Sequence, residues 1–219
     1  MTQCLNPALI FHATALSSYS AKVRLVLCVK GIDFEERAPA HGYRSPEYRS
    51  LVPMGTLPAI QEGDWVLSES EAINEYLEER YPTPLMLPQD IRLRAQVRFL
   101  CRFHDLYLEP KVRALFPHVK LAQRNSQTVL ELQHDIQVRL GQLAAWAQPQ
   151  PFLLTPTISL ADCGPLVSIH LAKALLTACG QSLELHPVLE EWLQKASECS
   201  DVERALAPWR DATQIWLSS

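Results

Sequence analysis

Residues 8–37 read ALIFHATALSSYSAKVRLVLCVKGIDFEER, and this stretch decides the fold of the N-terminal half. It opens with a short apolar run over 8–13, as a buried strand does. The run over 22–30 is apolar around most of its circumference, and Gly31 follows where a helix ends in a left-handed cap. A second strand is expected at 33–37. A right-handed crossover through the helix makes the two strands parallel.

Residues 45–80 predict three more elements. Ser45 and Pro46 supply the N-cap and first position of a short helix. Two apolar runs within 58–67, joined by a turn, predict a hairpin. From Ser68 the apolar residues recur at helical spacing, so we expect an amphipathic helix with a solvated acidic face. That face contains Glu71, Glu75, Glu78 and Glu79.

The stretch YPTPLMLP at 81–88 marks a domain boundary, because neither a helix nor a central strand tolerates its three prolines. Every strong periodic signal beyond it is helical. We therefore expect a first domain over 1–82, a linker over 83–90 and a second domain over 91–219. The expected fold class is a small mixed α/β unit followed by an all-α bundle.

The composition narrows the function classes. Of the 219 residues, 47% are hydrophobic and 20% are charged, which is typical of an ordinary globular protein. The formal charge of -4 argues against nucleic acid or an anionic membrane as a partner. Six cysteines without CxxC spacing predict reduced thiols, and the histidines lack metal-ligand spacing. The first basic residue is Lys22 and the longest weakly polar stretch, 165–180, is too short to span a bilayer, so we expect a cytoplasmic protein.

Three motifs together resemble the cytosolic glutathione transferases, in particular serine-type, bacterial-like members with a zeta-like SSxS motif. They are SSYSAKVRL at 17–25, MGTLPAI at 54–60 and LSESEAINEYLEERYP at 67–82, and SLAD follows at 159–162 in the helical half. The resemblance covers both expected domains. It implies a thioredoxin-like first domain, an all-α second domain, glutathione as co-substrate and a homodimer.

Ser17 is the candidate catalytic residue. It lies at the turn from the first strand to the first helix, where its hydroxyl and the free N–H groups of the helix favour negative charge. A hydroxyl that donates to a thiolate lowers the pKa of the thiol, and the thiolate is the nucleophile. The resemblance places Ser17 on the catalytic position, with Ser18 beside it. In a purely structural alternative, these serines only cap the helix.

The resemblance also implies the residues that bind glutathione. Leu57 would pair its backbone with the cysteinyl part of glutathione, and Pro58 after it would be cis. The glycine carboxylate would meet a basic residue before the second helix, for which Arg44 is the candidate and His41 the rival.

At the other end of the tripeptide, the resemblance puts Ser70 on the γ-glutamyl carboxylate and Glu69 on its amino group. The physical basis is the N-terminus of a helix, which favours an anion. The alternative is an ordinary helix start, because Ser68 and Glu71 also fit a capping box.

Tyr19, His104 and Tyr107 are candidates for the pocket of the second substrate. His104 and Tyr107 share a predicted helical face with Leu93 and Leu100, and in transferases this helix lines the pocket of the electrophile. For each of the three, packing in the core is the competing interpretation. Further wall candidates with the same alternative are Phe116, Trp209 and Trp216.

The leading hypothesis is a glutathione transferase, of the kind that acts in detoxification, in which Ser17 stabilises the thiolate and a hydrophobic electrophile is attacked. One alternative is a glutathione-dependent isomerase of the zeta (maleylacetoacetate) type. Another is a noncatalytic partner-binding protein that keeps the fold, as the stringent starvation proteins do. The sequence leaves open which electrophile reacts, and whether glutathione serves conjugation, isomerisation or peroxide reduction.

Overall fold

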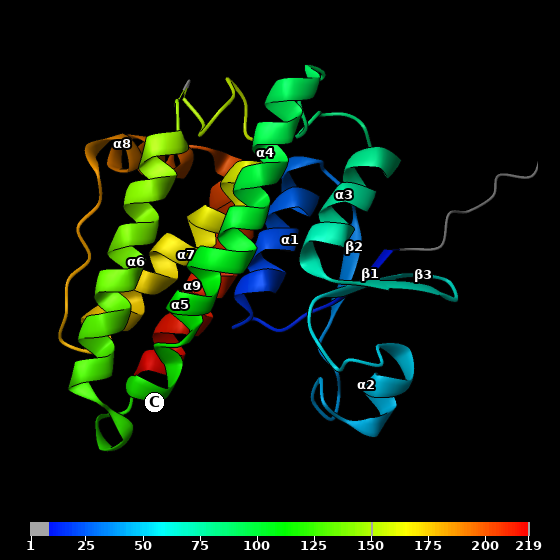
Figure 1. Ribbon diagram of the computed structural model, residues 1–219. Coiled ribbons are helices and arrows are strands. Elements are labelled where there is room, and N and C mark those ends of the chain that lie inside the picture. The colour runs from blue at the N-terminus through cyan, green and yellow to red at the C-terminus, as the bar shows by residue number, and fades with distance from the viewer. Residues whose placement is uncertain (1–8, 150, 219) are drawn as a thin grey trace, which may run out of the picture.

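The computed structural model describes residues 9–149 and 151–218 (Figure 1). Its N-terminal half is a four-stranded sheet with three helices. The elements are β1 (Leu9–His12), α1 (Ser18–Val29), β2 (Phe34–Arg37), α2 (Pro46–Leu51), β3 (Ala59–Glu62), β4 (Trp65–Ser68) and α3 (Ser70–Arg80). The strand order is β2-β1-β3-β4. Strands β1 and β2 are parallel, whereas β3 is antiparallel to both β1 and β4, so the predicted crossover and hairpin are confirmed.

The C-terminal half is helical throughout its regular elements. It contains α4 (Ile91–Phe103), a π-helical turn η1 (His104–Leu108), α5 (Glu109–Arg113), the short 3-10 turns η2 (Phe116–His118) and η3 (Leu121–Gln123), α6 (Ser126–Trp146), α7 (Leu160–Ala178), α8 (Pro187–Ser197) and α9 (Ser200–Leu217). The fold class predicted from the sequence is therefore confirmed. None of the helices in the described ranges combines the length and apolar character needed to cross a bilayer.

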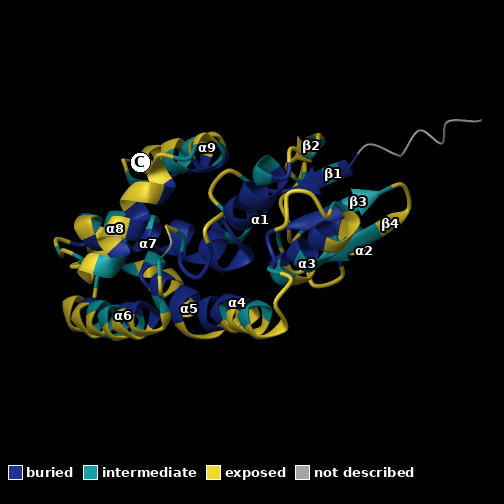
Figure 2. Ribbon diagram, turned by 90° about the horizontal axis from the view of Figure 1, so that it is seen from above, coloured by how far each residue is buried: buried dark blue, intermediate teal, exposed yellow. Residues whose placement is uncertain are grey.

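Helix α1 lies between the sheet and the helical half, where it packs against α3, α7 and α9 (Figures 1 and 2). Its residues from Ser20 to Leu27 are all buried, which explains why it is apolar around its circumference. One hydrophobic core runs from Phe11 in the sheet to Trp192 in α8. The two halves thus share a core.

The prediction that the acidic face of α3 is solvated is wrong for two of its glutamates. Glu78 is 6% exposed, and its carboxylate lies 2.6 Å from the Nζ atom of Lys30. Glu71 lies 2.6 Å from the Nζ atom of Lys22, which is 1% exposed. Lys22 lies in the buried helix α1 and Lys30 is the C-cap that follows it, so the acidic face of α3 neutralises charges that the pattern within α3 cannot reveal.

The segment between α3 and α4 is anchored by the same ion pair. Lys30 Nζ donates to the carbonyl oxygens of Tyr81 and Pro84 at 2.7 and 2.9 Å. Glu78 accepts the backbone N–H groups of Met86 and Leu87. A buried carboxylate and a buried ammonium therefore satisfy a stretch of backbone that has no helix or strand of its own.

The cysteines in the described ranges are free thiols, as expected: Cys28, Cys101, Cys163, Cys179 and Cys199. Cys4 lies outside the described residues. Burial raises the pKa of Cys101 and Cys163 well above the usual value, so these thiols stay protonated.

Candidate functional site

A cavity of about 1110 Å³ lies where the sheet half meets the helical half. The sheet half contributes the residues singled out for glutathione: Ser17, Arg44, Leu57, Pro58, Glu69 and Ser70, together with Tyr19. The helical half contributes Arg102, Asp105, Leu106, Arg113, Phe116 and Trp216. Residues from the β1–α1 turn, the loop before β3 and the start of α3 thus line the same cavity.

Ser17 is the N-cap of α1 and lines the cavity at the same time. Its Oγ atom accepts the N–H of Ser20 at 3.2 Å. A hydroxyl that accepts this bond keeps its own proton for another acceptor, so the capping role and the catalytic role are compatible. Ser18 differs, because it is 3% exposed and its hydroxyl donates to Glu109 Oε1 at 2.5 Å. Of the two serines, only Ser17 lines the cavity.

The peptide bond between Leu57 and Pro58 is cis, as the resemblance implied. Within residues 9–149 and 151–218, the N–H and C=O of Leu57 form no hydrogen bond. Because Leu57 lines the cavity, both groups are available to pair with an extended ligand backbone.

Helix α3 begins at Ser70, and Glu69 before it adopts φ 76° and ψ 114°. A positive φ is uncommon for a residue with a side chain, and such strain of roughly 1–3 kcal/mol is concentrated at functional sites. The Ser70 hydroxyl has no hydrogen-bond partner in the described parts of the chain. The capping box weighed for Ser68 and Glu71 does not form, since Glu71 pairs with Lys22 instead. The N-terminus of α3 is therefore open toward the cavity.

Arg44 lies on the exposed rim of the cavity, with its guanidinium 5.5 Å from the centre of the Tyr43 ring. It forms no ion pair within the described ranges, which leaves the guanidinium available to a carboxylate. His41, the rival candidate, does not line the cavity.

Of the three residues predicted for the pocket of the second substrate, Tyr19 lines the cavity, whereas His104 and Tyr107 do not. His104 is 2% exposed and bonded to Asp105 and Ser168. Tyr107 is 48% exposed, and its ring contacts Phe103 and Arg139. His104 shares a buried face with Val97 and Leu100, as its spacing predicts, but this face packs in the core. Tyr107 lies within the π-helical turn η1. Asp105 and Leu106 face the cavity in their place.

Of the other aromatic candidates, two line the cavity and one lies in the core. Phe116 and Trp216 line the cavity and contact each other with ring centroids 5.3 Å apart. Trp209 is 1% exposed and belongs to the core. Packing is therefore the role of Trp209, whereas the other two rings form a wall of the cavity.

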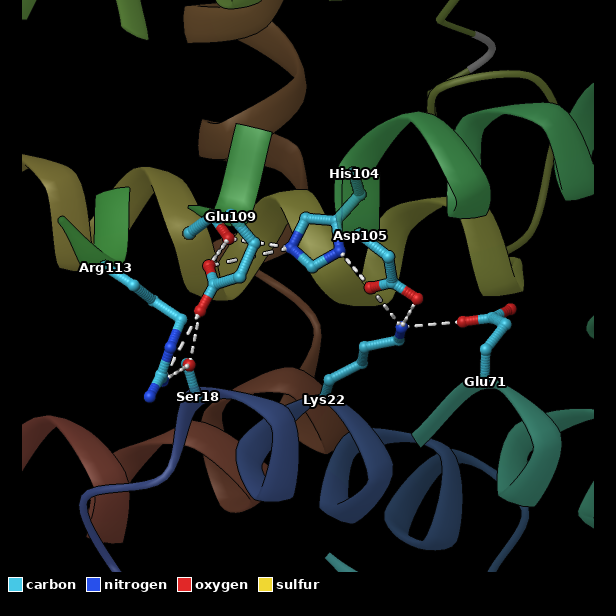
Figure 3. A network of polar contacts seen from close by, with 8 residues as sticks. Ser18, Lys22, Glu71, His104, Asp105, Glu109 and Arg113 are labelled. Carbon is cyan, nitrogen blue, oxygen red and sulfur yellow. Dashed lines mark hydrogen bonds and ion pairs between the residues drawn. The ribbon is translucent and has the colours of Figure 1, made fainter. Parts of the chain in front are cut away.

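A buried polar network connects the cavity to the interior, and the sequence analysis missed it (Figure 3). Glu109, fully buried at the start of α5, accepts hydroxyl donors from Ser18 in α1 and Ser168 in α7. His104 Nε2 lies 2.7 Å from Ser168 Oγ, and His104 Nδ1 lies 2.8 Å from Asp105 Oδ1. The network thus ties α1 to the π-helical turn and to α7.

Lys22 completes the network and sets the charge of Asp105. Its Nζ atom donates to both Asp105 oxygens, at 2.8 and 3.1 Å. Burial would raise the pKa of Asp105, but the hydrogen bond from His104 and the Lys22 ammonium outweigh it and lower the pKa to about 2. Burial, Glu109 and Asp105 together raise the pKa of Tyr19 to about 12, so this phenol stays protonated and can donate a hydrogen bond. Across residues 9–149 and 151–218, no group of His, Cys, Asp or Glu side chains is arranged to hold a metal ion.

Comparisons of the sequence with known proteins match the N-terminal part of this chain. Residues 11–85 match the family described as "Glutathione S-transferase, N-terminal domain". A glutathione S-transferase of Triticum aestivum is 39% identical over 85 residues, which is 39% of this chain and 39% of that protein. A maleylacetoacetate isomerase of Pseudomonas aeruginosa is 39% identical over 104 residues, 42% of this chain and 48% of that protein. The chain thus spans less than half the length of these two relatives.

The structural likeness extends over nearly the whole chain. The human glutathione S-transferase T1-1 in its apo form superposes with a TM-score of 0.81 and 27% identity. The superposition covers 94% of this chain and 91% of that structure, and so includes the helical half.

Proposed function

Because residues 11–85 belong to the glutathione S-transferase N-terminal family, we propose that this protein is a glutathione transferase. In this proposal Ser17 stabilises the thiolate of glutathione, and the thiolate attacks a small electrophile bound against the helical half. The observation that supports it is the single cavity lined by Ser17, the cis Leu57–Pro58 peptide and the open N-terminus of α3. Glutathione is a co-substrate here, and no metal takes part.

Each part of the tripeptide has a proposed partner. The backbone of Leu57 pairs with the cysteinyl residue, in the manner of an added strand. Ser70 and the N–H groups of α3 bind the γ-glutamyl carboxylate, and Glu69 binds its amino group. Arg44 meets the glycine carboxylate. This arrangement leaves the cysteinyl sulfur at the turn before α1, beside the hydroxyl of Ser17.

The reaction needs only one proton to leave before bond formation. The thiol releases its proton to solvent, and Ser17 donates a hydrogen bond to the sulfur, which favours the charged form. The thiolate then forms a bond to the electrophilic carbon, and either a leaving group departs or a proton adds to the neighbouring carbon. Tyr19 stays neutral, since its pKa is raised to about 12, so it can donate a hydrogen bond to the electrophile.

The proposal includes the assembly and the division into domains. Residues 1–82 bind glutathione, 83–90 link the domains, and 91–219 supply the electrophile pocket. We expect a cytoplasmic homodimer in which α3 and α4 lie at the interface. An electrophile and a second copy of the chain are the partners, without nucleic acid or membrane.

Ultraviolet difference spectra during titration with glutathione test the proposal, because the thiolate absorbs and the thiol does not. The wild type should form the thiolate near neutral pH. Ser17→Ala should raise the pKa of the bound thiol by roughly one to two units, because it loses a charge-assisted hydrogen bond. Ser50→Ala is the control, because it removes an exposed hydroxyl outside the cavity, and it should keep the thiolate. A wild type that binds no glutathione would favour the noncatalytic partner-binding alternative, which a pull-down with a stoichiometric partner would support.

Isomerisation is the second candidate function, favoured by the similarity to the Pseudomonas aeruginosa maleylacetoacetate isomerase. The same thiolate would add to a cis double bond, allow rotation and leave again. Turnover of a cis-dienone acid without net loss of glutathione would separate isomerisation from conjugation.

A further inference from the structure

Arg113 is the side chain on which this inference depends. It ends α5 and lines the cavity with its side chain 45% exposed. Its guanidinium carbon lies 5.5 Å from the centre of the Tyr19 ring and 5.7 Å from that of Phe116. Two aromatic faces therefore hold the guanidinium in place, as cation–π contacts do.

The inner edge of the guanidinium is also fixed. Nη1 donates to Ser18 Oγ at 3.2 Å and lies 3.9 Å from Glu109 Oε1 (Figure 3). Glu109 is fully buried, and its two oxygens already accept the hydroxyls of Ser18 and Ser168. The remaining donors of Arg113, on Nε and Nη2, form no hydrogen bond with residues 9–149 or 151–218. A preorganised guanidinium with spare donors thus borders the cavity.

The charges expected on glutathione do not need Arg113. In the proposed function its two carboxylates go to Arg44 and to the start of α3, and its ammonium goes to Glu69. Asp105, the acidic residue that lines the helical side of the cavity, is already paired with Lys22. Arg102 also lines this side and forms no ion pair within the described ranges. The unpaired Arg102 and the outer edge of Arg113 are therefore the cationic groups that this side offers to a ligand.

We propose that the electrophile carries a carboxylate, which the free edge of Arg113 binds while Tyr19, Phe116 and Trp216 contact its conjugated or aromatic body. The planar fork of an arginine matches a carboxylate in a bidentate geometry. This inference rests on the proposed function and makes it more specific: the preferred substrate is an anionic electrophile rather than a purely hydrophobic one. Arg113 is its specificity-determining residue.

A matched pair of substrates tests it: 4-chloro-3-nitrobenzoate and 4-chloro-3-nitrobenzamide. In both, the thiolate sulfur bonds to the ring carbon that carries chlorine, and chloride leaves with the bonding electrons. The measured quantity is the ratio of kcat/KM for the acid to kcat/KM for the amide, which cancels changes common to both. Arg113→Gln should lower this ratio about 10- to 100-fold, mainly through KM for the acid, as loss of a charge-assisted hydrogen bond implies.

Two further variants define the controls. Arg139→Gln removes another guanidinium that lies over an aromatic ring, 5.6 Å from the centre of Tyr107, but outside the cavity. It should leave the ratio unchanged. Arg113→Lys keeps the charge and loses the planar fork, so it should recover part of the ratio. If Arg113→Gln does not fold, the salt dependence of KM for the wild type tests the inference instead. Salt should raise KM for the acid and leave KM for the amide unchanged.

The outcomes separate this inference from the proposed function. A ratio that Arg113→Gln and Arg139→Gln change equally, or a wild-type KM for the acid that salt does not affect, overturns the inference while thiolate formation stands. If Arg113→Gln raises the pKa of the bound thiol and slows both substrates equally, Arg113 acts on glutathione and the inference is wrong. A wild type that forms no thiolate overturns both.

Discussion

Ser18, at the first position of α1, donates its hydroxyl to the fully buried carboxylate of Glu109, 91 residues later in the chain, at 2.5 Å. The bond connects the helix that follows Ser17 to the helix that carries Arg113. The backbone next to the proposed thiolate site is therefore positioned by the helical half as well as by its own strand and helix.

Ser18→Ala should destabilise the fold by about 1–3 kcal/mol, because Glu109 loses a donor while remaining buried. Urea unfolding measures the loss. Ser50→Ala is a suitable control, since the Ser50 hydroxyl is exposed and bonds only to the Glu47 carbonyl within its own helix. Equal stabilities of the Ser18→Ala and Ser50→Ala proteins would show that the bond to Glu109 contributes little.

Gly164→Ala should destabilise the protein by about 1–3 kcal/mol through overpacking. A Cβ atom at this position of α7 would lie 2.5 Å from Nδ1 of His104, whose ring is held by Asp105 and Ser168. Adding His104→Ala removes the obstacle, so the two substitutions should be strongly non-additive in a double-mutant cycle of unfolding free energies.

Gly141→Ala is the matched control for this cycle. It also lies within a helix, α6, but a Cβ atom there would meet nothing within 4 Å. It should stabilise the protein by up to about 1 kcal/mol, the difference between the helix propensities of glycine and alanine. Additive effects of Gly164→Ala and His104→Ala would contradict the close approach.

Asp105 should make the stability depend on pH below about 4. Its pKa is about 2 in the folded protein, below the unfolded value of about 3.9, so it contributes stability above pH 4 and loses it as the pH falls toward 2. The shift corresponds to roughly 2–3 kcal/mol. The difference in unfolding free energy between wild type and Asp105→Asn should therefore shrink on acidification from pH 7 to 3. A difference that stays constant over this range would rule out Asp105 as the titrating group.

Lys30→Met should cost about 3–5 kcal/mol, because Glu78 would be left as an unpaired buried charge beneath the segment that joins α3 to α4. Lys195→Met removes an exposed ion pair with Glu198 and should cost less than about 1 kcal/mol. Thermal unfolding of the two variants checks the contrast. A Lys30→Met protein as stable as Lys195→Met would mean that the buried ion pair between Lys30 and Glu78 contributes little.

Much of the architecture was predictable because it depends on local signals. The apolar run before Ser17, the cap at Gly31, the Ser45-Pro46 helix start and the turn within the hairpin each specify an element through residues a few positions apart. In α7, Ser159 and Asp162 form the capping box that their spacing predicts. The candidates that the resemblance implied for glutathione line one cavity in the structure.

The residues that the helical half contributes to the cavity were harder to predict from the sequence. The helical period places His104 on one face with Val97 and Leu100, but it does not show that this face packs in the core and not in the cavity. Arg113 carries no motif and stands among other charged residues along the chain. Its significance appears only when Tyr19, Ser18 and Phe116 surround it.

The sequence by itself determined the order of strands and helices, the parallel pair β1 and β2, and the serine at the mouth of α1. Tertiary structure alone decided that Lys22, Lys30 and Glu109 are buried, and which charges neutralise them. The reason is physical: periodicity reports which face of one element avoids water, whereas a buried charge is tolerated only beside partners from other elements. For Lys22 and Lys30 those partners lie 48 to 83 residues away, at a separation that no local pattern records.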